Sequence, residues 1–362
     1  MGSFTPMGEL VHCQPLDRDL PFHHPTPLVT PSQCQRSRAR LGELTHLRAR
    51  DPERLELERF PDFLILGPQR TGTTWLYHNL KKHPQVFLPR QKETYYFSTL
   101  GRPEHAHYTF DYLDDFLTAH MTEGWRHRLK RHYDGLRNYG ECYRPIVRGE
   151  ATATNALLAP EIIAELVAIQ PDLKAVLMLR DPIERAWSHA RKDLVRKHGR
   201  RPEDVSVEDY ARFFRASGQR GLASFVSLLQ TWTAALKPGH LFVGDFEMIE
   251  ASPRELLTGL QRFLGIRSGE RYFNRHLEER INPAAADVVS RPSHMPDVAR
   301  DYLMDLLAEE ADQYRELRRL FQLGDIRPSL PGIGVISFPA APTNFEGSCQ
   351  DSSRAKPGDE NV

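Results

Sequence analysis

The ten residues from Gly67 to Leu76, Gly-Pro-Gln-Arg-Thr-Gly-Thr-Thr-Trp-Leu, constrain the fold more than any other stretch of the chain. They follow the apolar run 63–66 and open a segment, 73–83, with a helical pattern. A glycine-containing turn between a strand and a helix lets backbone N–H groups converge on a phosphate, and the helix N-terminus adds partial positive charge. The segment therefore predicts a phosphate-binding loop in an α/β fold; the alternative is an ordinary glycine-containing turn.

The charge within this loop is unusual for a nucleotide triphosphate site. The spacing of Gly67 and Gly72 fits a Walker-type loop, but Thr73 stands where that loop has lysine. The cation is Arg70, inside the turn, where it is better placed for a group attached to a single 5′-phosphate. Thr73 and Thr74 add hydroxyl donors.

A second segment, 177–189, predicts another anion site. Arg180 follows the apolar run 174–179, and Asp181-Pro182 is a typical helix start. Ser188 would lie about two turns into that helix. An arginine fork and a hydroxyl so placed can hold a phosphate dianion. Taken singly, Arg180 is equally an ion-pair partner for a neighbouring carboxylate, and Ser188 an exposed hydroxyl.

Together these segments resemble the two nucleotide motifs of the sulfotransferases that use 3′-phosphoadenosine 5′-phosphosulfate (PAPS). The first is similar to the 5′-phosphosulfate loop, especially in the heparan sulfate and bacterial branches, and arginine within the loop resembles the tyrosylprotein branch. The second resembles the 3′-phosphate motif. The resemblance implies PAPS as donor, with Arg70 also neutralising charge on the transferred sulfuryl group. The implied ligand positions are Arg70, Thr71, Gly72, Thr73, Thr74, Trp75, Arg180 and Ser188.

The segment 88–97 supplies a candidate base. It resembles the Glu-x-x-Phe-Phe-like segment of the heparan sulfate and tyrosylprotein branches, which implies that Glu93 is the catalytic base. A carboxylate in a partly desolvated cleft suits that role. The alternative is a solvated Lys92–Glu93 pair. Because sulfotransferases of small phenols and steroids use histidine, the backup candidates are His105, His107, His127 and His132.

The acceptor stays open between a small molecule and a glycan, attacked through a hydroxyl or an amine. Sugar, phenol, steroid, lipid and peptide all remain candidates, since acceptor loops carry no readable code. We expect residues 149–152 to form a wall of the acceptor cleft. Aromatic side chains also indicate a cleft for a ring or apolar body: Tyr95, Tyr96, Phe97, Trp125 and Tyr133.

Alternation of apolar runs and amphipathic segments predicts an α/β, three-layer, P-loop-like fold with a central parallel sheet flanked by helices. We expect an irregular arm over residues 1–58, a sulfotransferase domain over 59–330 and an irregular, disordered tail over 331–362. Ser252 to Glu255 forms a capping-box pattern, and 297–321 predicts one long closing helix.

The amino-acid composition excludes several classes of protein. The 362 residues carry 48 Lys+Arg and 48 Asp+Glu, which argues against a nucleic-acid coat protein. Four scattered cysteines exclude a disulfide scaffold. No apolar run is long enough for a membrane span or a secretory signal, so we expect a cytoplasmic protein.

We expect that the protein needs no metal. The oligomeric state is open. The rival functions are a P-loop kinase of a small metabolite and a non-catalytic nucleotide-binding module.

Overall fold

The computed structural model describes residues 37–101, 110–216, 218–273, 277, 295–323 and 333–337. The strands are β1 (Phe63–Gly67), β2 (Val86–Phe87), β3 (Val147–Ala151), β4 (Lys174–Leu179), β5 (Leu241–Asp245) and β6 (Ile333–Ser337). The α-helices are α2 (Thr73–Lys82), α3 (Tyr96–Thr99), α4 (Leu113–His120), α5 (Trp125–Tyr139), α6 (Pro160–Ile169), α7 (Pro182–Ala190), α8 (Val207–Ala216), α9 (Gln219–Ala223), α10 (Phe225–Ala235), α11 (Met248–Ala251), α12 (Pro253–Leu264), α13 (Asp297–Leu306) and α14 (Ala308–Leu323). Shorter helical turns are η1 (Leu57–Arg59), η3 (Ala153–Leu157), η4 (Arg191–Arg196), η5 (Pro202–Asp204) and η6 (Glu270–Tyr272).

The strands form one parallel sheet in the order β2-β3-β1-β4-β5-β6. After β1 the chain adds β3 and β2 on one side, then crosses to β4 on the other. Ligands of open α/β sheets bind at the carboxyl ends of the strands where the order reverses. This topology therefore directs attention to the loops that follow β1, β3 and β4.

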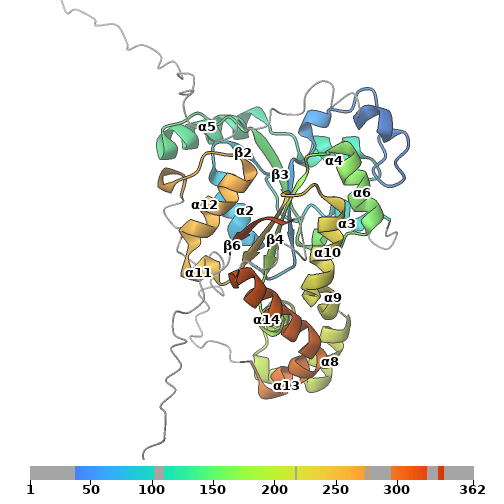
Figure 1. Cartoon of the computed structure of the whole chain (residues 1–362), viewed down its shortest axis with the longest axis vertical. Coiled ribbons are helices and arrows are strands. Elements are labelled where there is room, and N and C mark those ends of the chain that lie inside the picture. The colour runs from blue at the N-terminus through green and yellow to red at the C-terminus, as the bar shows by residue number, and fades with distance from the viewer. Residues whose placement is uncertain are drawn as a thin grey trace, which may run out of the picture.

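Successive residues of each central strand alternate between two apolar layers, as a strand buried on both faces requires. In β1, Leu64 and Leu66 pack with the layer under α6 and α10, whereas Phe63 and Ile65 pack with α2 and α12. Figure 1 shows these helix pairs on opposite sides of the sheet. The predicted three-layer α/β fold is confirmed.

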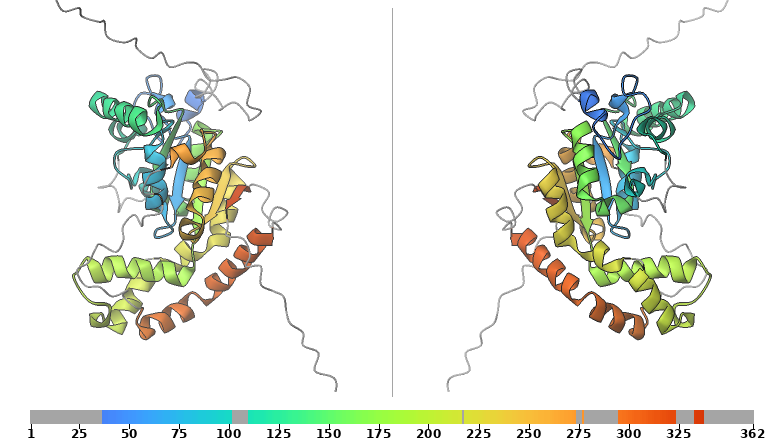
Figure 2. Two further views of the ribbon diagram at one scale, coloured as in Figure 1. Left: turned by 90° about the vertical axis from the view of Figure 1, so that its left-hand side faces the viewer. Right: turned by 90° about the vertical axis from the view of Figure 1, so that its right-hand side faces the viewer.

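A further group of helices lies below the sheet. Helices α7, α8 and α13 share a separate apolar cluster, and Figure 2 shows them extending below the strands together with α14. The prediction of one long helix over 297–321 is wrong. The chain breaks at Leu307, whose φ of −115° and ψ of 20° depart from helical values. Leu307 is fully buried at this bend, so packing overrides the continuous leucine pattern.

At two other places the local structure differs from the prediction. Helix α12 begins at Pro253 and ends before a left-handed Gly265 as expected, but the Ser252 side chain makes no capping hydrogen bond. In the stretch expected to be an irregular tail, 333–337 pairs with β5 as an edge strand, because its Ile-Gly-Val-Ile-Ser sequence suits a β-strand.

The domain boundaries stay a prediction. Within 37–58, which we expected to be irregular, Leu41, Leu47, Leu55 and Leu57 are buried in the core cluster beside α6. None of the helices in the described ranges combines the length and the apolar composition needed to cross a membrane.

Candidate functional site

The loop between β1 and α2 requires its two glycines. Gly67 ends β1 with φ of 103°, and Gly72 caps α2 with φ of 91°, both in the region that favours glycine. A Cβ at Gly67 would overlap the backbone of Ala153, and one at Gly72 would overlap the side chain of Ile249. The loop is therefore packed closely between neighbouring segments, with the N-terminus of α2 at its end.

The two predicted phosphate motifs meet at this loop. Arg70 Nε donates to Ser188 Oγ at 3.0 Å, and Arg180 Nη1 donates to the Arg70 carbonyl oxygen at 2.9 Å. The Arg180 guanidinium also lies 4.1 Å from the centre of the Phe246 ring. Residues more than 100 positions apart thus form one cluster at the carboxyl ends of β1 and β4, which is what a shared anion site requires.

Several arginines lie close enough together in this cluster to affect one another. Burial and the neighbouring Arg180, Arg196 and Arg191 lower the pKa of Arg70 to about 10, and burial lowers the pKa of Arg180. Arg191 and Arg196 lie on η4, directly after α7. The sequence argument missed both, although their place one helix after the second motif was a usable signal. Cations held together in this way favour binding of an anion between them.

The side chains at the other predicted ligand positions fall into two groups: those of Thr71 and Trp75 bond within the protein, and those of Thr73 and Thr74 lie at the start of α2. The Thr71 hydroxyl donates to the Pro68 carbonyl at 2.7 Å, and the buried Trp75 ring donates through Nε1 to the Leu277 carbonyl at 3.1 Å. These two side chains stabilise the loop and the core. Thr73 is buried and Thr74 half-buried at the start of α2. A role for all four in binding a phosphate, through backbone N–H or hydroxyl groups, stays a prediction.

Glu93 lies on a strained turn beside the loop. Its φ is 62°, and among the described residues the other non-glycine positions with positive φ are Arg70 and Tyr95. Strain of this kind gathers at functional sites. Glu93 Oε2 accepts from the Ala153 N–H at 2.9 Å, and Oε1 pairs with Lys92 Nζ. Since Ala153 also contacts Gly67, the carboxylate is fixed near the start of the loop. Both side chains of the ion pair are mostly buried, so the pair is not the solvated alternative.

A second carboxylate, Glu150, lies fully buried at the end of β3. Its oxygens accept from the hydroxyls of Thr94, at 2.7 Å, and Thr152, and from Asn155 Nδ2 at 2.8 Å. Burial, with the Glu93 charge nearby, raises the pKa of Glu150 to about 7. Thr152 Oγ1 also accepts from the Tyr95 N–H at 3.3 Å. Glu150 therefore anchors the turn that carries Glu93. We expected 149–152 to be a cleft wall, whereas this side chain supports the turn from inside.

The five aromatic side chains expected to line one cleft lie in different surroundings. Tyr95 lies half-buried next to Glu93, but Tyr96 and Phe97 are core residues, and Tyr96 stacks on Phe116 with ring centres 4.4 Å apart. Trp125 and Tyr133 lie on the outer face of α5. The last four are therefore not part of one cleft, because local helix packing separates them.

The backup histidines are placed as follows. His105 and His107 lie outside the described residues. His127 and His132 are on α5, where His127 Nδ1 contacts Glu123 at 2.9 Å. Helix α11 follows the carboxyl end of β5 and so marks the end of the sheet where the loop after β1 also lies. Figure 1 shows α5 at the opposite end of the sheet from α11 and α14. These two histidines are therefore remote from the loop that follows β1.

A model of the sulfotransferase family matches residues 61–270, more than half of the chain, including Glu93 and both predicted phosphate motifs. The chain belongs to the sulfotransferase family. It is 25% identical over 227 residues to bifunctional heparan sulfate N-deacetylase/N-sulfotransferase 3 of Homo sapiens, covering 58% of this chain and 23% of that protein. It is 29% identical over 172 residues to carbohydrate sulfotransferase 15 of Mus musculus, covering 41% of this chain and 29% of that protein.

The alignments thus span less than a third of the length of these curated relatives. Among solved structures, a sulfotransferase from Alicyclobacillus acidocaldarius matches with a TM-score of 0.50 at 19% identity, covering 71% of this chain and 95% of that chain. This likeness supports the fold.

Proposed function

We propose that this protein transfers the sulfuryl group of PAPS to a hydroxyl or amine of an acceptor, with Glu93 as general base. The observation that carries the proposal is the contact of the loop arginine, Arg70, with Ser188 and Arg180 of the second motif. It brings two anion-binding segments into one site, and the donor is an adenosine nucleotide with anionic groups at both its 3′ and 5′ positions.

The residues present fit that donor. When bound, PAPS supplies the sulfuryl group, and its transfer releases adenosine 3′,5′-bisphosphate. The loop N–H groups and the N-terminus of α2 would hold the 5′ end, since they carry partial positive charge. Arg180 and Ser188 would hold the 3′-phosphate. Bound phosphates would offset the burial and the cationic neighbours that lower the pKa of Arg70.

Arg70 belongs to both halves of the site. Its backbone lies in the 5′ loop, while its guanidinium reaches Ser188 of the 3′ motif. We propose that it stabilises negative charge that develops on the leaving oxygen, as fixed cations do in other group transfers. Lys92 Nζ pairs with Glu93, and we propose that the same ammonium would also contact the sulfuryl oxygens.

Glu93 would remove the acceptor proton during attack on sulfur. The Ala153 N–H and Lys92 fix its two oxygens, and an ionised carboxylate has about four lone-pair positions, so an acceptor O–H or N–H can still bind it. Glu150, beneath the same turn, would keep Glu93 in place. It is a positioning residue, because its oxygens are used by Thr94, Thr152 and Asn155.

The acceptor is proposed only as a class. The relatives are described as acting on heparan sulfate, through an N-sulfotransferase, and on carbohydrate. We therefore propose a carbohydrate hydroxyl or amine as the first acceptor to examine, with small-molecule alcohols and phenols next. A cytoplasmic location remains part of the same proposal.

Calorimetry and a transfer assay together test the proposed function. We expect adenosine 3′,5′-bisphosphate to bind without added magnesium, and labelled PAPS to modify at least one member of a carbohydrate and small-molecule acceptor library. A magnesium-dependent signal with ATP and none with the bisphosphate would favour a kinase. Tight bisphosphate binding with no transfer to any acceptor would favour a non-catalytic nucleotide-binding module.

A further inference from the structure

Helix α5 presents an apolar stripe to solvent. Trp125, Leu129, Tyr133 and Leu136 follow each other at intervals of three or four residues, so they share one helix face. Their exposed fractions are 70%, 63%, 61% and 48%. Large apolar side chains gathered on a single exposed face mark an interaction surface, whereas scattered ones do not.

The buried face of α5 explains why this stripe points outward. Arg131 and Gly135, on the opposite face, are the buried residues of the helix. Arg131 Nη2 donates to the carbonyls of Lys81 and Val86, the latter at 2.9 Å, and its guanidinium lies 4.1 Å from the centre of the Tyr143 ring. The helix is thus attached to the body through an arginine and its carbonyl partners.

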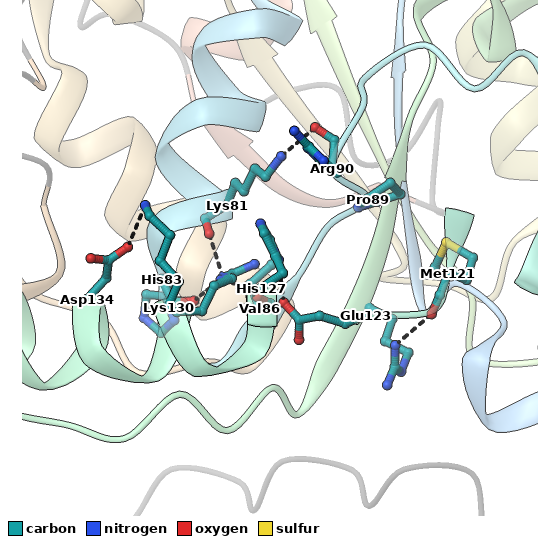
Figure 3. A network of polar contacts seen from close by, with 12 residues as sticks. Lys81, His83, Val86, Pro89, Arg90, Met121, Glu123, His127, Lys130 and Asp134 are labelled. Carbon is teal, nitrogen blue, oxygen red and sulfur yellow. Dashed lines mark hydrogen bonds and ion pairs between the residues drawn. The ribbon is translucent and has the colours of Figure 1, made fainter. Parts of the chain in front are cut away.

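Figure 3 shows Lys81, His83 and Val86 gathered beside α5, with Lys130 and Asp134 projecting from the helix. At Gly135, an added Cβ would lie 2.6 Å from the Glu141 carbonyl oxygen, so the backbone itself packs against its neighbour. The orientation of α5 is therefore fixed by polar contacts and close backbone packing, and its apolar face is left for another surface.

Cations border the stripe on both sides. At 3.6 residues per turn, Arg126, Lys130 and Arg137 lie along one border, and Arg128 lies along the other. With Arg131, the helix carries five cationic side chains and one acidic one, Asp134. An exposed helix with an apolar crest, an aromatic side chain and basic borders has the pattern of helices that lie in a membrane interface.

A basic cavity of about 280 Å³ adjoins one border of this helix. It is lined by four arginines, of which Arg128 belongs to α5, and by the single carboxylate of Glu123; the arginines are Arg59, Arg128, Arg144 and Arg148. Burial lowers the pKa of Arg148. Within the described ranges, Arg128 and Arg144 have no carboxylate partner. The cavity therefore has the charge to receive a phosphate group.

We propose that α5 docks this protein on an anionic lipid surface. The apolar stripe would enter the boundary between headgroups and acyl chains, the bordering cations would meet lipid phosphates, and the arginine-lined cavity would take one headgroup phosphate. Charge complementarity favours this occupant. A second copy would oppose one basic helix to another, and a sulfated glycan would neutralise the cations but leave Leu129 and Leu136 in water. The proposal is independent of sulfuryl transfer.

Vesicle binding by the full chain tests the proposal. The probes are vesicles of phosphatidylcholine containing roughly one-third phosphatidylglycerol, and vesicles of phosphatidylcholine alone. We expect sedimentation with the anionic vesicles, weakened by salt. Trp125 gives an independent readout, since Trp75, Trp187 and Trp232 are buried. Its fluorescence should shift to shorter wavelength when the anionic vesicles bind.

Paired variants separate the two contributions. Leu129→Ser combined with Leu136→Ser should weaken anionic-vesicle binding roughly tenfold or more, because less apolar area is buried. Arg128→Gln with Arg144→Gln should weaken it about fivefold per cation removed. Met304→Ser, at a 53% exposed position on α13, is the matched control and should bind like the parent.

Three outcomes would overturn the proposal. The first is absence of binding to anionic vesicles, or binding that the leucine variants leave unchanged. The second is a dimer in light scattering that the same leucine variants dissociate, which would assign the stripe to a second copy. The third is that the protein does not bind vesicles but binds a sulfated glycan, and that this binding depends on Arg128 and Arg144 but not on Leu129 and Leu136.

Discussion

Arg70 and Ser188 are 118 residues apart in the chain, and the arginine Nε donates to the serine Oγ at 3.0 Å. One residue comes from the turn after β1, the other from the second turn of α7. Because β1 and β4 are neighbours in the sheet, their following segments emerge side by side. The contact therefore joins the two predicted anion-binding motifs, as the proposed binding of a nucleotide with two phosphorylated ends requires.

Ser188→Ala should weaken adenosine 3′,5′-bisphosphate binding by roughly 10- to 100-fold, the range for losing a hydrogen bond to a charged group. Adenosine 5′-monophosphate, which lacks the 3′-phosphate, should bind parent and variant equally. Calorimetry with both nucleotides measures the difference. Ser224→Ala, which removes a hydroxyl bonded to the Arg220 carbonyl, is the control. An equal loss for both nucleotides would remove Ser188 from the 3′ end of the site.

Arg70→Gln should separate ligand binding from stability. Burial and, after it, the neighbouring Arg180 lower the pKa of Arg70, so folding disfavours the charged guanidinium and its removal relieves both the desolvation and the repulsion. We expect a melting temperature equal to or above that of the parent without ligand, and bisphosphate affinity reduced by roughly 100-fold. Thermal unfolding with and without nucleotide measures both quantities. A large loss of stability without ligand would show that Arg70 mainly supports the fold.

Glu93→Gln should lower kcat by roughly 10²- to 10⁴-fold, because the amide cannot accept the acceptor proton. Bisphosphate affinity should stay unchanged, since Glu93 lies beside the nucleotide loop and is not among its predicted ligands. Transfer kinetics on an identified acceptor and calorimetry check the two expectations. Near-parental turnover would reject Glu93 as the base.

Much of this site could be predicted from sequence because its signals are local. Gly67, Gly72 and Arg70 sit between one strand and one helix, and Arg180 and Ser188 keep a fixed spacing across a helix start. Contacts between segments could not be predicted in this way. Arg191 and Arg196 matter only because η4, which continues α7, brings their charges near Arg70, and Glu150 matters only because Thr94 and Thr152 converge on it.

The same limit explains two expectations that the structure corrects, the single helix over 297–321 and the cleft position of Trp125 and Tyr133. A leucine pattern over 297–321 does not reveal that Leu307 is buried at a bend. Trp125 and Tyr133 were expected to line a cleft, but Arg131 on the other face of α5 donates to the carbonyls of Lys81 and Val86, and the face with both aromatic side chains is exposed. Side-chain partners distant in sequence decide both cases.

Glu150→Gln should change how stability depends on pH. Burial raises the pKa of Glu150 from 4.5 to about 7, so the folded protein keeps a proton between these values that the unfolded chain has lost. Stability from this group is complete below pH 4.5 and is lost as the pH rises through 7. The variant cannot ionise, so its stability relative to the parent should increase from pH 5 to pH 8, on the order of 2–3 kcal/mol.

The amide should fit this position, because Asn155 Oδ1 has no hydrogen-bond partner within the described residues and can accept from glutamine after a flip. Denaturant unfolding at both pH values measures the effect. Glu161→Gln, at an exposed position on α6, is the control. Parallel pH profiles for Glu150→Gln and the parent would contradict a buried, protonating carboxyl.

Two glycine substitutions test the close packing of α5 against a matched helix position. An alanine Cβ at Gly135 would meet the Glu141 carbonyl oxygen at 2.6 Å, and backbone cannot move as a flexible side chain does, so Gly135→Ala should destabilise by about 1–3 kcal/mol. At Gly259 in α12, the nearest atom is Phe242 Cε2 at 3.8 Å, an ordinary contact, so Gly259→Ala should stabilise by about 0.5–1 kcal/mol. Urea unfolding of both variants and the parent measures these changes in the free energy of unfolding. If Gly135→Ala instead stabilised the protein, α5 would not be held by close backbone packing, and the outward direction of its apolar stripe would depend on Arg131 alone.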